Sequence, residues 1–225
     1  MAQHLDLEEQ EQLAQIKHFW SKYGNLITWV LIVVFGTIAA YNGWNWWQRR
    51  QAEQASALYD AVERAVKAKD LPQVQRALTD VRDQYGRTAY AQQAALLAAK
   101  AMQDNGKDDE ARAALTWVAD KSSDEGYQAL ARLRLAALLA DTKSYDDALK
   151  QLSVKFPSSF EPLAADRRGD ILTLQGKAGQ ARAEYQKALD GLGDQGEYRR
   201  LVEIKLAALG GEPTPAKAAA GAAKS

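Results

Sequence analysis

The side chains best suited to catalysis or metal binding are scarce in this chain and lie near its amino end. The only two histidines, His4 and His18, precede a long apolar run, and there is no cysteine. The larger region after that run therefore lacks imidazole and thiolate groups. This excludes Ser-His-Asp and Cys-His catalysis there, together with thiolate or imidazole metal sites. Disulfides are excluded throughout.

Carboxylates and glycine-lysine pairs are the remaining candidates for chemistry. The acidic runs at 108–110 and 146–147 fall at predicted helix starts, where negative charge stabilises the helix dipole. Gly106 and Gly176, each followed by Lys, lack the Gly-x-x-x-x-Gly-Lys-Ser/Thr spacing that cradles phosphate. Hydrolysis by a carboxylate pair stays open, although no pair stands out. We therefore expect no enzyme activity, no metal and no cofactor.

The apolar run at residues 23–48 contains no Asp, Glu, Lys, Arg or His. About 20 apolar residues span a bilayer, so we predict one transmembrane helix over 23–48 after a tail of residues 1–22. The alternatives are a buried core helix and a cleaved signal peptide. The acidic tail and the length of the run disfavour cleavage. The residues expected to anchor the helix at or near the membrane surfaces are Trp20, Tyr23, Trp29, Trp44, Trp46, Trp47, Arg49 and Arg50.

The charge distribution excludes one class of partner and leaves the orientation open. Lys plus Arg and Asp plus Glu both number 29, so no net field favours nucleic acid. Lys17 and Lys22 precede the apolar run, whereas Arg49, Arg50, Arg64 and Lys67 follow it. Taken alone, the positive-inside rule places the large domain in the cytoplasm, but this rule is a bias that long domains can override.

The region at 49–210 repeats a pattern of a turn followed by an apolar helix. The turns fall at 69–74, 106–111, 143–148 and 176–181, and their last residues are spaced 37, 37 and 33 apart. A period near 34 is typical of stacked helical pairs. Further packing positions lie four and seven residues on, with Lys155 as the one exception. We predict an all-α solenoid over 49–210, closed by a helix at 197–209, and a disordered tail at 211–225.

These residues resemble the tetratricopeptide repeat. In that family a small residue twelve places before the turn-side alanine lets two helices approach closely, and Ala99, Ala136 and Gly169 match it. The first repeat departs from the pattern with Val62, and no repeat keeps the family's tryptophan. The fold implied is a helical solenoid whose first helices form a concave wall. Outward positions on that wall are Gln93, Leu96, Lys100, Gln103, Leu130, Leu133, Asp166, Asp170 and Thr173, which we expect to bind protein unless the register is shifted and the leucines are core.

The whole layout is similar to a narrower family, the YfgM-like ancillary subunits of the bacterial Sec translocon. The similarity rests on the acidic tail, the tryptophan-flanked span with Trp44-Asn-Trp-Trp47, the following Arg-Arg and the degenerate repeats. It implies an inner-membrane protein with a cytoplasmic amino end and a periplasmic repeat domain. It also implies partners, namely the translocon and periplasmic chaperones or client chains. This orientation conflicts with the charge count.

Two functions from different classes follow. The first is a membrane-anchored adaptor, because tethering raises the effective concentration of a weak binding surface near its partner. The second is a self-associating assembly protein of the cell envelope. An anchored enzyme is a more distant third.

Overall fold

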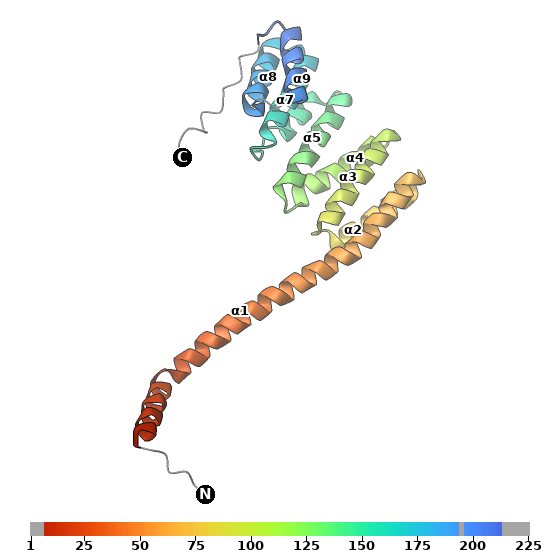
Figure 1. The fold of residues 1–225 in the computed structure, drawn as a ribbon. Helices are drawn as coiled ribbons and strands as arrows, with labels where there is room; N and C mark the ends of the chain where they lie inside the picture. The colour runs from red at the N-terminus through yellow and green to blue at the C-terminus, as the bar shows by residue number, and fades with distance from the viewer. Residues whose placement is uncertain (1–6, 194–195, 213–225) are drawn as a thin grey trace. The chain divides into compact units, whose positions relative to one another are not determined.

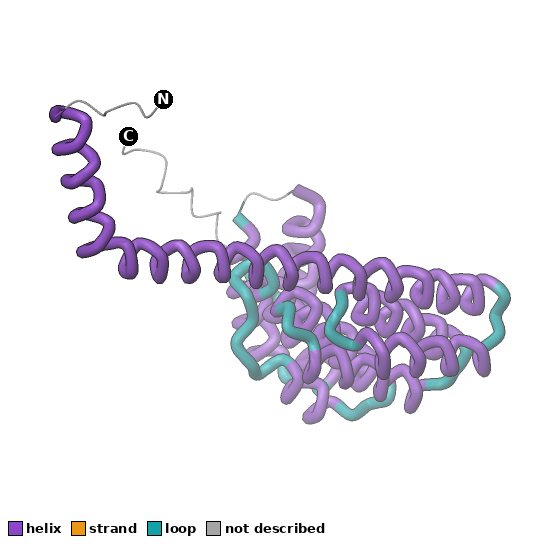
Figure 2. Tube along the Cα trace, turned by 90° about the horizontal axis from the view of Figure 1, so that it is seen from below, coloured by secondary structure: helices purple, strands orange, loops and turns teal. Residues whose placement is uncertain are grey.

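The computed structural model describes residues 7–193 and 196–212, and all regular secondary structure in these ranges is helical (Figures 1 and 2). The all-α prediction is confirmed. The chain forms two compact units, Met1–Glu53 and Gln54–Ser225. The helices are α1 (Leu7–Lys67), α2 (Leu71–Tyr85), α3 (Ala89–Asp104), α4 (Asp108–Lys121), α5 (Glu125–Asp141), α6 (Tyr145–Gln151), α7 (Glu161–Leu174), α8 (Ala178–Leu192) and α9 (Gly196–Ala208).

The first unit consists, within the described residues, of the amino-terminal part of α1. The helix already begins at Leu7, so the described part of the predicted tail is helical, while residues 1–6 lie outside the described ranges. Among the described residues, only the stretch Ile16–Lys67 is long and apolar enough to cross a membrane. Its large apolar side chains from Leu26 to Ile38 are exposed on the helix, apart from the half-buried Ile27. A lone apolar helix with internally satisfied backbone groups suits lipid.

The second unit is built from helical pairs that turn in the same way. The pairs are α1 and α2, α3 and α4, α5 and α6, and α7 and α8. Two residues after the end of each first helix comes a residue with positive φ, between 56° and 72°. These residues are Lys69, Gly106, Lys143 and Gly176. In each turn the next amide donates to a carbonyl five residues back, as Lys107 does to Met102 at 2.8 Å, which is the Schellman closure of a helix. In two repeats a lysine thus adopts the left-handed backbone conformation that a glycine adopts in the other two.

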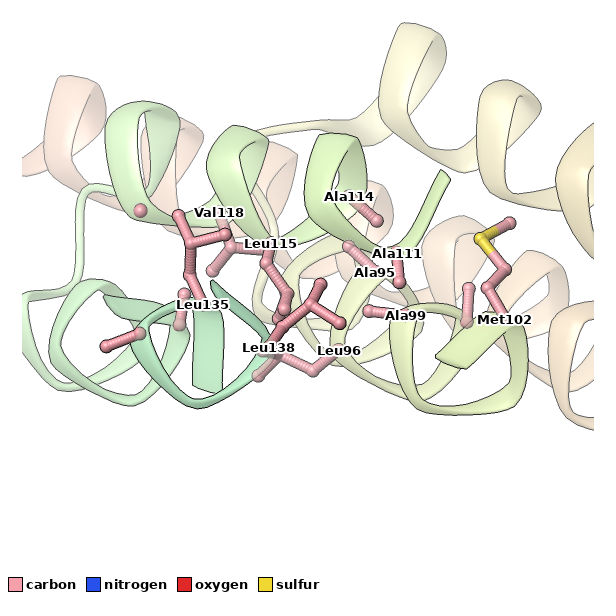
Figure 3. Close-up of a cluster of buried hydrophobic side chains, with 14 of the residues drawn as sticks. Ala95, Leu96, Ala99, Met102, Ala111, Ala114, Leu115, Val118, Leu135 and Leu138 are labelled. Atoms are coloured by element: carbon pink, nitrogen blue, oxygen red, sulfur yellow. The ribbon is translucent and has the colours of Figure 1, made fainter. Parts of the chain in front are cut away.

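The core lies between the first and second helices of successive pairs. Figure 3 shows side chains of α3, α4 and α5 pointing toward one another, among them Leu96, Leu115 and Leu138. The predicted close-approach alanines, Ala99 and Ala136, are buried. Small side chains there let the helices pack closely, so leucine and valine from the facing helix fill the space.

The predicted packing positions are buried with the one exception already visible in the sequence. Lys155 is exposed, because α6 ends at Gln151 and the chain is irregular from there to Phe160. The buried positions are Leu78, Val81, Leu115, Val118, Leu152, Tyr185 and Ala188.

The last helix, α9, closes the solenoid as a first helix without a second. It buries Val202 and Leu206 in a cluster with residues of α7 and α8. Two residues after its end comes Gly210, whose φ is 74° and which lies 34 residues after Gly176. The predicted terminal helix is confirmed. Of the tail predicted to be disordered, residues 213–225 lie outside the described residues.

Candidate protein-binding surface

The first helices α3, α5 and α7 carry the surface predicted to bind protein. Gln93, Lys100, Gln103 and Thr173 are exposed. Leu130, Leu133 and Asp170 are half-buried. We call these seven residues the first-helix surface. Its polar members and two partly accessible leucines are suited to contacts with another polypeptide.

Leu96 does not belong to this surface, and the expectation that it points outward is wrong. Its side chain is 5% exposed, and Figure 3 shows it beside Leu138 of α5. Arg134 of α5 also donates to the Leu96 carbonyl at 3.4 Å, so α5 lies directly against α3 at this level. The position therefore faces the neighbouring first helix, and Leu96 is a core residue.

Asp166 occupies the corresponding position in α7 and is also buried, at 3% exposure. Its carboxylate accepts hydrogen bonds from the Lys205 ammonium at 2.8 and 2.9 Å and from the Tyr198 hydroxyl at 2.7 Å, both on α9. A buried carboxylate needs such partners, because an unpaired charge inside a protein is costly. The expected outward role of Asp166 is therefore wrong, and its observed contacts hold α9 on α7.

The half-buried Asp170 extends the same network one helical turn further along α7. Lys205 lies 2.7 Å from its carboxylate, and the Tyr185 hydroxyl donates to it at 3.0 Å. Burial raises the pKa of Tyr185 to about 12, and the two nearby carboxylates add to this effect. Burial and the bond to Asp166 likewise raise the pKa of Tyr198. Both hydroxyls therefore remain protonated donors at neutral pH.

Two tyrosines at the amino-terminal side of this region, Tyr90 and Tyr127, went unnoticed in the sequence. The rings of Tyr59 and Tyr90 lie 6.1 Å apart, and Gln93 donates to the Tyr127 hydroxyl at 2.7 Å. Tyr90 and Tyr127 are 37 residues apart, which is the spacing of the repeat turns. That spacing was the signal that could have found them. They give the polar first-helix surface an aromatic edge.

The apolar part of α1 satisfies its own polar groups. The hydroxyls of Thr28 and Thr37 donate to carbonyls four residues back, at 2.8 and 2.7 Å. Such bonds remove hydroxyl donors that lipid could not satisfy. At its carboxyl end, the Arg50 guanidinium lies 5.1 Å from the centre of the Trp46 ring. The predicted anchor residues are all exposed on the helix.

Clustered metal ligands do not occur within the described residues, where no three acidic or histidine side chains come together in a suitable way. The arrangement that is present offers shape, hydrogen-bonding groups and modest apolar area. These are the means of reversible protein binding on a helical-repeat scaffold.

Comparison with known proteins agrees with this architecture. The family model of the tetratricopeptide repeat-like domain matches residues 17–211. A protein of Neisseria gonorrhoeae called an ancillary SecYEG translocon subunit is 32% identical over 93% of this chain and 100% of its own length. A protein of the same name in Haemophilus influenzae is 30% identical over 89% of this chain and 97% of its own length.

The Escherichia coli protein of that name is 27% identical over 79% of this chain and 85% of its own length. No solved structure gave a significant match. The fold is that of a tetratricopeptide repeat-like protein with an amino-terminal apolar helix. The chain belongs to the family of ancillary SecYEG translocon subunits.

Proposed function

We propose that this protein is a non-enzymatic adaptor of the bacterial inner membrane that associates with the Sec translocon and links it to periplasmic chaperones. The proposal rests on the presence of two parts in one polypeptide chain. One is a single apolar helix of membrane-spanning length, and the other is a repeat domain with an accessible first-helix surface. The relatives named for the SecYEG translocon supply the partner.

Anchoring in the membrane explains why the small first-helix surface is sufficient to bind a partner. The first-helix surface offers two half-buried leucines and five polar residues, which is too little for tight binding on its own. Confinement to the membrane that holds the translocon raises the effective concentration of the two partners, so weak contacts become productive. The adaptor can then release its partner readily.

A second candidate function, self-association, is favoured by one feature of α9. Leu201 and Ile204 lie one turn apart and are 46% and 61% exposed. A terminal repeat usually covers its outer face with polar residues. An apolar pair there is suited to a second copy of the chain, as expected for an assembly protein of the envelope.

The orientation is tested by protease added to the periplasmic side of intact spheroplasts. We expect an epitope placed after Ser225 to be lost, while the same epitope placed before Met1 survives until the membrane is broken. Long domains can translocate against a small charge bias such as that between Lys22 and Arg49-Arg50. Protection of the carboxyl-terminal epitope would refute the periplasmic assignment and direct the search to cytoplasmic partners.

A further inference from the structure

The third helical pair has an unusually short second helix. α6 has 7 residues, whereas α2, α4 and α8 have 15, 14 and 15. Pro157 disfavours helical geometry at Phe156, and the β-branched Val154 adds little helix propensity. The chain therefore leaves the helix after Gln151 and runs irregularly to the start of α7.

The missing helical turns leave a pocket of about 490 Å³ against α5. Gln128, Ala129 and Arg132 line it from α5, and Val154, Lys155 and Phe156 line it from the irregular segment. This volume falls in the range that accommodates ligands, about 300–1,000 Å³. Val154 is 39% exposed, whereas Phe156, at 5%, anchors the segment in the core.

Both ends of the segment are fixed by hydrogen bonds. The Arg168 guanidinium of α7 donates to the Leu152 carbonyl at 2.9 Å and is itself held by Glu184 at 2.7 Å. At the other end, the amides of Phe160 and Glu161 donate to the Pro157 carbonyl at 2.8 and 3.1 Å. The segment is therefore held in place beside the pocket.

Between these fixed ends the main chain keeps free hydrogen-bonding groups. Within the described part of the chain, no backbone–backbone hydrogen bond engages the amide or carbonyl of Val154 or Lys155, and both residues are exposed. In an otherwise helical domain, such groups must bond to water or to a partner. Polypeptides that bind in extended form use main-chain hydrogen bonds of this kind, with side chains entering adjacent pockets.

We propose that this pocket binds an extended segment of an unfolded polypeptide, whose main chain bonds to the exposed main chain of residues 154–155 and whose aliphatic side chain enters beside Val154. The inference rests on the proposed function, since chains in transit would be the ligand. Glu125 and Lys155 supply both signs of charge at the pocket, so neither acidic nor basic segments are favoured strongly. This suits a site for chains of varied sequence, and it is separate from the first-helix surface.

The test uses the full chain in lipid nanodiscs and fluorescently labelled, reduced and carboxymethylated α-lactalbumin as the unfolded probe. Val154→Asp places a charge where an apolar side chain is expected and should weaken binding about tenfold. Leu201→Asp adds the same charge at an aliphatic residue of similar exposure on α9, and should leave the affinity within about twofold.

A second variant tests the main-chain contact. Lys155→Pro removes one free amide donor and should weaken probe binding about threefold, as expected for a single hydrogen bond. Thermal unfolding of all variants should match that of the parent, because the substituted side chains are exposed. Equal binding by Val154→Asp and the parent, equal loss in Val154→Asp and Leu201→Asp, or no probe binding by the parent would overturn the proposal.

The result is separable from the test of the proposed function. Probe binding in nanodiscs does not depend on the side of the membrane that the repeat domain occupies in cells. If the repeat domain is protected from protease but the probe still binds, the periplasmic adaptor proposal is refuted and the pocket proposal stands. If the probe test refutes the pocket proposal, the adaptor role rests on the first-helix surface.

Discussion

Replacing Gly169 by alanine should destabilise the repeat domain by about 2 kcal/mol. A Cβ atom at this position in α7 would lie 2.5 Å from the Tyr185 ring, far closer than van der Waals contact allows. The ring cannot easily move, because it is 3% exposed and its hydroxyl donates to Asp170. Either α7 and α8 must separate or the hydrogen bond must break. Urea unfolding of the full chain in detergent micelles, followed by circular dichroism, measures the change.

Gly179→Ala in α8 is the matched control, since a Cβ atom there meets nothing within 4 Å. The same substitution should stabilise the domain by about 0.5 kcal/mol, because alanine loses less backbone entropy on folding than glycine. Destabilisation by both variants, or by neither, would contradict the proposed close contact between α7 and α8.

Of these substitutions, Asp166→Ala should lower the free energy of unfolding most, by about 3 kcal/mol, and should release α9 from α7. The substitution leaves the Tyr198 hydroxyl without its acceptor and Lys205 with one carboxylate, Asp170, instead of two. We place the loss at the low end of the range for broken buried pairs, because the Lys205 side chain is 25% exposed and Asp170 still faces it. Hydrogen exchange followed by mass spectrometry should show faster exchange in α9.

The surface pair of Lys100 and Asp104 supplies the comparison. Both side chains are more than half exposed, at 67% and 57%, although their atoms lie 2.9 Å apart. Asp104→Ala should therefore change stability by less than about 0.5 kcal/mol. Unchanged exchange in α9 of the Asp166→Ala variant would show that the apolar contacts of Val202 and Leu206 hold the helix without the ionic network.

The repeat turns could be predicted from sequence because the same local chemistry recurs. An alanine or valine lies five residues after the first residue of each turn, and all four of these apolar side chains are buried. Lys155 interrupts the pattern at a packing position. That single charge was the visible sign that the second helix of the third pair ends early.

The binding surface was harder to predict, because burial at one position depends on the neighbouring repeat. Leu96 and Asp166 occupy equivalent places in α3 and α7, and both are covered by the next first helix. A pattern within one repeat gives the face of a helix, but the angle between successive pairs decides what covers that face. The contacts from Arg134 and Lys205 come from residues 38 and 39 positions away, beyond the reach of local pattern.

The adaptor role is tested most directly by photocrosslinking in intact cells. A photoreactive benzoylphenylalanine replaces Lys100 on the first-helix surface, and the control places it at Thr79 on α2, which is also exposed. We expect the Lys100 position to form adducts with a translocon subunit and with a periplasmic chaperone, and the Thr79 position to form far fewer. Adducts consisting only of a second copy of the chain, or equal patterns from both positions, would contradict the adaptor and favour self-association or chance encounters.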